Sequence, residues 1–239
     1  MKLLDLGGEW SFRKGTENKK LLALVPGCVH TDLLNNNQID DPYFADNEKA
    51  QMWIGESDWT YNRTFQVKKD LLSGDRIELV CEGLDTLATV KINGKIVGKA
   101  DNAFRTWRFD IKRALSAGSN TIEILFRSTI PFINKLQKRN HMTLTGVDSH
   151  RIDGSNQIRK SQCNYGWDWG PMCVTCGIWR NIRIESAVTA KLQDVYIGQD
   201  HRQRGSVGVD VQISANRYRE ETSLLAEVII EKDGKELSR

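Results

Sequence analysis

The fold is decided by the stretch Thr89-Val90-Lys91-Ile92-Asn93-Gly94-Lys95-Ile96-Val97-Gly98. Asn93-Gly94 stands between two short runs that alternate or contain β-branched apolar residues. Asn and Gly both tolerate positive φ angles, which the two central positions of a type I′ turn require. The stretch therefore predicts a tight β-hairpin.

Other parts of the chain repeat this pattern. Apolar and polar residues alternate in residues 76–81, 120–127 and 178–185, which predicts three more strands. Helical segments are few and short, with one turn expected at 31–34 and another at 111–117, ending near Gly118. Many short strands separated by turn residues indicate an all-β protein, either a β-sandwich or a jelly roll.

Composition narrows the class of protein. The chain has 239 residues, of which 39% are hydrophobic and 27% charged, which is typical of a globular protein. Its net charge of +3 is spread without a basic block, so nucleic acid is not an expected partner. No apolar run approaches the roughly 18 residues of a membrane helix, so no membrane partner is expected. The first ten residues show no signal peptide, which favours a cytoplasmic location; a periplasmic or lysosomal one remains open if a leader was removed.

Five cysteines, an odd number, argue against a complete disulfide framework. Cys173 and Cys176 have CxxC spacing, but no second pair or nearby histidine completes a zinc site. The residues that follow alternate like a strand, whereas a redox CxxC normally opens a helix. We therefore expect free thiols, no metal and no cofactor. The sequon at Asn62-Arg63-Thr64 is weak support for secretion.

The alternation disappears between residues 128 and 170, where polar residues dominate. A long irregular segment in a compact β domain is commonly functional. It ends in Gly166-Trp167-Asp168-Trp169-Gly170-Pro171, in which a carboxylate stands between two indoles. The glycines and the proline favour a shaped loop.

Two interpretations of this loop stay open. Indole faces suit sugar C–H surfaces, and the Asp168 carboxylate can accept hydrogen bonds from paired hydroxyls. Alternatively, Asp168 pairs with one of three cations and shapes a structural corner; the candidates are Arg159, Lys160 and Arg180. We favour scaffolding over sugar stacking for Trp167 and Trp169, as anchors that order the loop.

A second unit is expected to begin near residue 187. Strand patterns return in 195–197, 206–214 and 224–231, and Asp233-Gly234 predicts another hairpin turn for which we expect no return strand. About three strands are too few for a complete immunoglobulin-like sandwich. We therefore expect two domains, 1–187 and a truncated 188–239.

Several stretches together resemble the N-terminal part of β-mannosidases of glycoside hydrolase family two. They run in order over residues 1–187, and the most distinctive are these: Leu6-Gly7-Gly8-Glu9-Trp10, Val25-Pro26-Gly27-Cys28-Val29-His30, Gly83-Leu84-Asp85-Thr86, Arg159-Lys160 and Gly166-Trp167-Asp168-Trp169-Gly170-Pro171. The resemblance implies a galactose-binding-like jelly roll, then an immunoglobulin-like domain, then a (β/α)₈ barrel.

In such enzymes the barrel carries both catalytic carboxylates and works by the retaining route. The resemblance therefore implies that no catalytic residue lies in this chain, which would be the N-terminal fragment of an exo-acting β-mannosidase and inactive alone. Its partners would be a β-mannoside and its own C-terminal barrel. Asp168 would contact hydroxyls of the terminal mannose, beside Trp167 and Trp169.

Two alternatives remain, a free-standing carbohydrate-binding module and a relative of β-galactosidases or β-glucuronidases. Other residues make weaker candidates. Asp40-Asp41 is followed by Pro42 and predicts a turn, and Ser149-His150 with Asp148 lacks the context of a catalytic nucleophile. His30 is expected to be structural.

Overall fold

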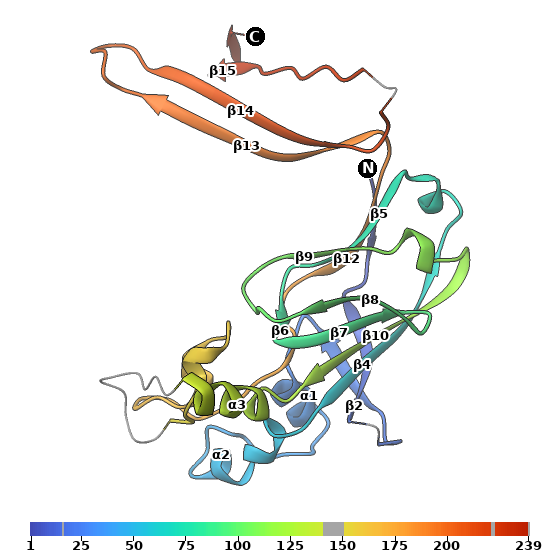
Figure 1. Cartoon of the computed structure of the whole chain (residues 1–239), viewed down its shortest axis with the longest axis vertical. Helices are drawn as coiled ribbons and strands as arrows, with labels where there is room; N and C mark the ends of the chain where they lie inside the picture. Colours follow the sequence, from blue (N-terminus) through green and yellow to red (C-terminus); the bar gives the residue numbers. More distant parts are fainter. Residues whose placement is uncertain (16, 141–150, 221–222, 239) are drawn as a thin grey trace.

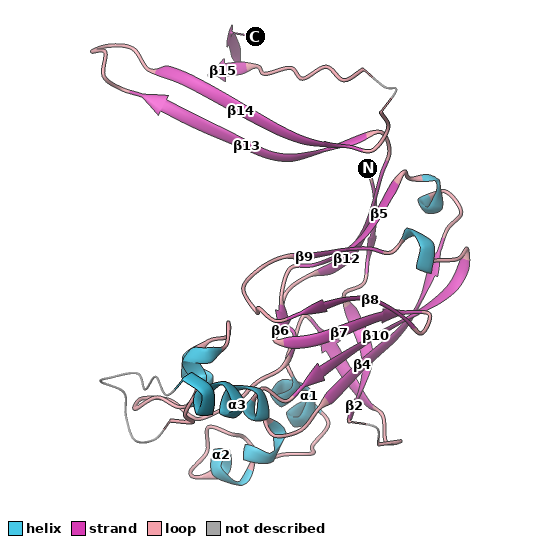
Figure 2. Ribbon diagram, in the orientation of Figure 1, coloured by secondary structure: helices cyan, strands magenta, loops and turns pink. Residues whose placement is uncertain are grey.

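The computed structural model describes residues 1–15, 17–140, 151–220 and 223–238. Two antiparallel sheets pack face to face as a sandwich, and a long hairpin projects from one end of it (Figures 1 and 2). The expected all-β class is therefore confirmed. Among the described residues, no helix has the length and apolar character needed to cross a membrane.

The smaller sheet has four strands, in the order β1 (Lys2–Asp5), β12 (Ile182–Ala187), β5 (Arg76–Cys81), β9 (Trp107–Asp110). The N-terminal strand thus pairs with one that comes much later in the chain, with Leu4 opposite Ile184. Strand β5 has the predicted bounds, and its Ile77 and Leu79 are fully buried. Period-two alternation places these side chains on the inner face.

The larger sheet has six strands, in the order β3 (Leu21–Val25), β2 (Gly8–Lys14), β4 (Trp59–Val67), β10 (Gly118–Arg127), β7 (Leu87–Ile92), β8 (Lys95–Ala100). Its inner face contributes aromatic rings to the core: Phe12 and Tyr61 stack at 5.5 Å, and Tyr61 meets the edge of Phe126 at 5.7 Å. All three side chains are fully buried. These rings share one core with Ile77 and Leu79 of the smaller sheet, and the burial of these large apolar groups supplies the main driving force for folding.

The hairpin predicted at Asn93-Gly94 is confirmed. It joins β7 to β8, and the two turn residues have φ angles of 50° and 78°. The helix expected at 111–117 is wrong in extent, because only the 3₁₀ turn Lys112–Ala114 forms. Gly118 begins β10 at a φ of 87°, so strand pairing claims the end of this segment, and so short a helix would not be stable alone.

Strands also differ from expectation near residue 180. The single strand expected at 178–185 is divided into β11 (Gly177–Ile178), which pairs with β6 (Leu84–Asp85), and β12. The break falls at Trp179, whose indole Nε1 donates to the Ala103 carbonyl at 3.0 Å. This long-range bond holds the chain where it passes from the β11–β6 pair to the smaller sheet.

The expectation of an irregular segment over 128–170 is wrong for its first part. Ile130–Asn140 forms helix α3, with Ile133 fully buried on its inner face. Ile133 belongs to a second, smaller core with Ile158, Tyr165 and Val174. The remaining helical elements are α1 (Val29–Asn35), α2 (Asn47–Ala50), and the 3₁₀ turns Met52–Ile54, Leu71–Ser73, Ser155–Gln157 and Gln162–Tyr165. Helix α1 contains the turn expected at 31–34.

Beyond the sandwich lies a hairpin of β13 (Ala190–Asp200) and β14 (Gly208–Arg217), followed by β15 (Ile230–Lys232) and β16 (Lys235–Ser238). The strand expected at 224–231 is reduced to β15, since no described strand pairs with its first residues. The turn at Asp233-Gly234 is confirmed, with φ angles of 51° and 73°. The expectation that it has no return strand is wrong, because β16 pairs with β15.

Salt bridges connect this hairpin to the sandwich. The Glu185 carboxylate in β12 is 2.8 Å from Arg108 and 2.8 Å from Arg183, and it also bonds Lys191 of β13. Burial alone would raise the pKa of Glu185, but these three cations lower it from 4.5 to about 2. Glu185 is therefore ionised and holds the first residues of β13 against the smaller sheet. The division into domains 1–187 and 188–239 stays a prediction.

Candidate functional site

The Trp-Asp-Trp sequence forms an exposed four-residue turn at one end of the sandwich. Gln162–Tyr165 makes one 3₁₀ turn, and Gly166 then redirects the backbone at a φ of 117°, which favours glycine. A bridge between Trp167 and Gly170 closes the turn. Asp168 and Trp169 therefore occupy the two central positions, where side chains project outward.

The two indoles lie at the surface. Trp167 is 38% exposed and Trp169 is 74% exposed, and their rings are 5.6 Å apart at an angle of 55°. The expectation that they anchor the loop is therefore wrong. The anchor is Tyr165, which is fully buried and whose hydroxyl donates to Thr129 Oγ1 at 2.6 Å. Tyr165 therefore takes the buried anchoring position that we expected for Trp167 and Trp169. Its phenol can be buried there because the hydroxyl finds a partner in Thr129.

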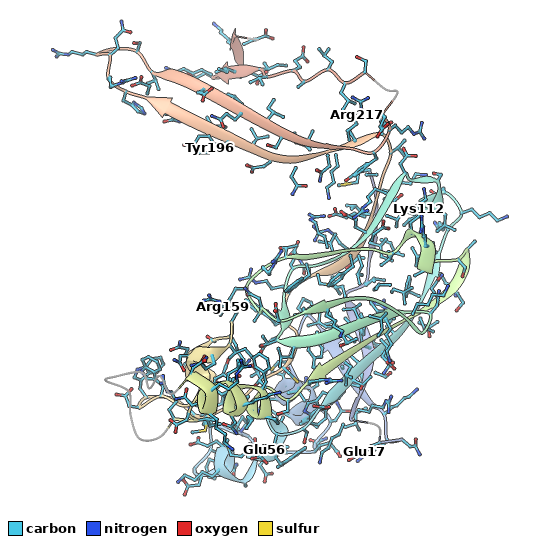
Figure 3. The ribbon with its side chains drawn as sticks, viewed as in Figure 1. Glu17, Glu56, Lys112, Arg159, Tyr196 and Arg217 are labelled. Atoms are coloured by element: carbon cyan, nitrogen blue, oxygen red, sulfur yellow. The ribbon has the colours of Figure 1, made fainter. Side chains whose placement is uncertain are left out.

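The Asp168 side chain is exposed and has no hydrogen-bond or salt-bridge partner in the part of the chain that the structure describes. The interpretation in which it pairs with a nearby cation is wrong for two of the three candidates, which are engaged elsewhere: Lys160 bonds Asp85, and the Arg180 guanidinium lies 4.1 Å from the centre of the Trp179 ring. The third, Arg159, forms an isolated backbone bridge with Asn102 beside the sandwich (Figure 3). No interaction joins Arg159 to Asp168 among the described residues. Asp168 is thus free to accept hydrogen bonds.

Beside this turn is a pocket of about 780 Å³, lined by ten residues: Glu48, Lys49, Met52, Arg151, Ile152, Gly166, Trp167, Asp168, Gly170 and Met172. It brings the Trp-Asp-Trp turn together with α2 and the turn that follows α2. Arg151 contributes a guanidinium whose Nη1 is buried and has no hydrogen-bond partner among the described residues. The pocket therefore combines apolar walls with a carboxylate and a cation, as sites for polar small molecules do. Trp169 is not among its lining residues.

The sequence pattern did not point to the residues from α2 or to Arg151. Residues 48–52 are far from Asp168 in the chain and carry no motif, so only the fold could bring them there. Asp85 was also missed. It is 8% exposed and bonds both Lys160 and Thr175, with Thr175 Oγ1 donating to Asp85 Oδ2 at 2.8 Å. The stretch Gly83-Leu84-Asp85-Thr86 carried part of the family resemblance, but nothing in the sequence singled out Asp85 within it.

The weaker candidates have structural roles. Asp41 accepts a hydrogen bond from the Tyr43 backbone N–H at 2.9 Å, which confirms a turn at Asp40-Asp41. His30 is 7% exposed, and burial together with Lys160 lowers its pKa to about 4, so it is neutral and structural as expected. Ser149, His150 and Asp148 lie outside the described residues.

The cysteines are free thiols, as expected. Burial raises the pKa of Cys173 to about 11 and that of Cys176 well above its usual value. A thiol must lose its proton to ligate a metal or attack a disulfide, so both residues are held in an unreactive form.

Comparison with known proteins agrees with this architecture. The family described as "Glycosyl hydrolase 2 galactose-binding domain-like" matches residues 10–180. A β-mannosidase from Bos taurus is 39% identical over 188 residues, which are 77% of this chain and 21% of that protein. β-Mannosidase B from Emericella nidulans is 35% identical over 222 residues, which are 88% of this chain and 26% of that protein.

Solved structures of glycoside hydrolases align with the same architecture. A β-D-mannosidase from Dictyoglomus thermophilum aligns with a TM-score of 0.84 and 35% identity, over 91% of this chain and 26% of that chain. A β-glucuronidase from an uncultured Clostridium aligns with a TM-score of 0.60 at 13% identity, over 90% of this chain and 34% of that chain, and thus shares the fold. The chain spans about a quarter of the length of the β-mannosidases that it matches. By its fold and by the match over residues 10–180, the chain belongs to the galactose-binding-like domain family of glycosyl hydrolases 2, with β-mannosidases among its relatives.

Proposed function

We propose that the chain is the N-terminal part of a retaining, exo-acting β-mannosidase, which hydrolyses terminal non-reducing β-D-mannose residues. In this proposal the chain forms one wall of the substrate pocket. Both catalytic carboxylates belong to a barrel outside this chain, so the chain alone has no hydrolytic activity. The β-mannosidases at 35–39% identity support the substrate class.

The observation that carries the proposal is the position of Asp168. Its carboxylate stands at the tip of an exposed turn, lines the pocket and has no partner in the described part of the chain. An ionised carboxylate can accept hydrogen bonds from two adjacent sugar hydroxyls. A site that bonds hydroxyls of defined orientation discriminates strongly between epimers, because the wrong epimer leaves polar groups unpaired.

The test is a comparison of Asp168→Asn and Asp168→Ala with the unchanged intact protein, on 4-nitrophenyl β-mannoside. We expect kcat/KM to fall at least about a hundredfold, since a substrate hydroxyl loses its charged acceptor. The melting temperature should stay unchanged because the side chain is exposed and unpaired. Turnover within a factor of about two of the unchanged protein would exclude the substrate role.

Asp153→Asn is the matched control for these variants. Asp153 is an exposed carboxylate in the same segment, but it does not line the pocket. Its substitution changes the net charge by the same amount as Asp168→Asn. We therefore expect normal kcat/KM from Asp153→Asn, so that a general electrostatic effect is separated from a contact with substrate.

A second candidate function, that of a free-standing carbohydrate-binding module, is favoured by the exposure of Trp167 and Trp169. Exposed indoles provide stacking faces for sugars. Calorimetric titration of the 239-residue chain with β-1,4-mannobiose separates the two functions. One wall of a shared pocket should bind with a dissociation constant in the millimolar range or weaker, and micromolar binding would favour the module.

A relative of β-glucuronidases or β-galactosidases is the remaining alternative. The β-glucuronidase structures share the fold at 13–18% identity, so they give no support for that substrate. We expect the intact protein to prefer aryl β-mannosides over aryl β-glucuronides and β-galactosides by several orders of magnitude in kcat/KM.

A further inference from the structure

The Asp85 carboxylate holds both arms of the loop that presents Asp168. From the upstream arm, Lys160 Nζ bonds Asp85 Oδ2 across 75 residues of sequence. From the downstream arm, Thr175 Oγ1 donates to the same oxygen at 2.8 Å across 90 residues. Lys160 Nζ also donates to Thr175 Oγ1 at 2.9 Å, so the two arms bond each other directly.

The charged pair in this cluster is buried, and Thr175 is half-buried. Lys160 is 3% exposed and Asp85 is 8% exposed, although both are charged residue types. A buried ion pair contributes little compared with an apolar pair, but the loss of one partner leaves an uncompensated charge and is costly. Separation of Lys160 from Asp85 would therefore leave an uncompensated charge inside the protein, which favours the observed arrangement of the loop.

The backbone of each arm is held by a different neighbour. On the upstream side, the Ala103 N–H donates to the Arg159 carbonyl at 2.9 Å. On the downstream side, Gly177 pairs with Asp85 itself in the short ladder between β11 and β6. Neither contact joins one arm to the other. Within the part of the chain that the structure describes, the side chains of Lys160 and Thr175 join the two arms at the base of the loop.

We propose that Asp85, Lys160 and Thr175 are positioning residues that fix the Trp167–Gly170 turn in the geometry that binds substrate. The inference rests on the proposed role of Asp168, because the three side chains do not line the pocket and act through the turn. A hydroxyl contact depends on placement within fractions of an ångström, so the segments on either side of the turn must be held in place.

Hydrogen exchange measured by mass spectrometry tests the inference without using activity. Lys160→Met in the intact protein removes the buried cation while keeping the length of the side chain. We expect amide exchange in residues 161–174 to become at least about tenfold faster, and exchange in β4 and β10 to stay unchanged. Unchanged exchange in 161–174, or an equal increase in β4 and β10, would overturn the proposal.

Lys91→Met is the matched control. Lys91 forms a 2.8 Å ion pair with Glu123 in the same sandwich, but these side chains are 33% and 30% exposed. Removal of a half-exposed pair changes little, so exchange in 161–174 should match that of the unchanged protein. If Lys160→Met lacks a cooperative unfolding transition and is therefore not properly folded, Thr175→Val is measured in its place. We expect the exchange rate of the same amides to rise about threefold in Thr175→Val. No increase in Thr175→Val would count equally against the proposal.

A kinetic cycle shows whether the cluster acts through the turn. Lys160→Met should lower kcat/KM for 4-nitrophenyl β-mannoside about tenfold. In an Asp168→Ala background it should lower kcat/KM less than about twofold, because the group that it positions has gone. If Lys160→Met lowers kcat/KM by the same factor in both backgrounds, its effect is a general structural one and the positioning role is refuted.

The two proposals fail in different ways. Normal turnover in Asp168→Ala, with faster exchange in Lys160→Met, would remove the substrate role and leave the cluster as the element that orders the loop. A large loss of turnover in Asp168→Ala, with unchanged exchange in Lys160→Met and Thr175→Val, would leave the substrate role and remove the cluster.

Discussion

Replacement of Glu185 by glutamine should make the stability of the sandwich less sensitive to acid pH. Glu185 is 4% exposed and is surrounded by Arg108, Arg183 and Lys191. A lowering of its pKa from 4.5 to about 2, at about 1.4 kcal/mol for each pH unit, corresponds to about 3 kcal/mol of stability. Glu185→Gln keeps the shape of the side chain and removes this charge.

The sign follows from which state binds more protons. The folded state has the lower pKa, so the stabilisation is complete above the unfolded value of 4.5 and is lost as pH falls toward about 2. The free energy of unfolding of the unchanged chain should therefore fall by about 3 kcal/mol more than that of Glu185→Gln between pH 7 and pH 2. At pH 7 the variant should be less stable by at least that amount, since three cations lose their carboxylate.

Urea unfolding followed by tryptophan fluorescence is the assay. All seven tryptophans lie before residue 188, so the signal reports the sandwich and not the projecting hairpin. Glu123→Gln is the control, because Glu123 forms a half-exposed pair with Lys91 and should contribute at most about 1 kcal/mol. A parallel pH profile for Glu185→Gln and the unchanged chain would refute the reasoning, since the acid-sensitive group would then lie elsewhere.

Three further outcomes follow from the fold. Phe126→Ala removes a fully buried ring from the centre of the core and should lower the free energy of unfolding by about 3–5 kcal/mol in urea. Gly94→Ala should lower it by about 1 kcal/mol, because nothing lies within 4 Å of the added Cβ and only the positive φ of 78° opposes it. In the folded protein at pH 8, iodoacetamide should label the exposed Cys163 first and leave the buried Cys81 unmodified, as mass spectrometry would show; labelling of Cys81 before Cys163 would contradict the burial.

Local patterns predicted local structure well. The bounds of β5 and the turn at Asn93-Gly94 followed from the alternation and from the φ preferences of two residues. Helix α3 was missed because its many polar residues weaken the periodic apolar pattern of a helix. Its buried residue, Ile133, packs against residues that come later in the chain. A helix stabilised by a few tertiary contacts leaves only a weak periodic signal.

The candidate site was predicted only in part. The turn and Asp168 stand out because the residue types are unusual, but the sequence could not show which aromatic group is buried. Tyr165 takes the interior position and leaves Trp169 in solvent. Asp85 and the lining residues from α2 depend on contacts between distant segments, which no pattern within one segment reports.

The pairing of β1 with β12 has a consequence for how the chain folds. Residues 2–5 find their strand partners in residues 183–186, so the smaller sheet cannot be completed until nearly the whole sandwich has left the ribosome. Until then β5 has β9 on one side and an open edge on the other. Such distant pairing slows folding and leaves an edge that other chains can join. The yield of soluble protein should therefore depend on the temperature and rate of synthesis more than the stability of the finished sandwich would suggest.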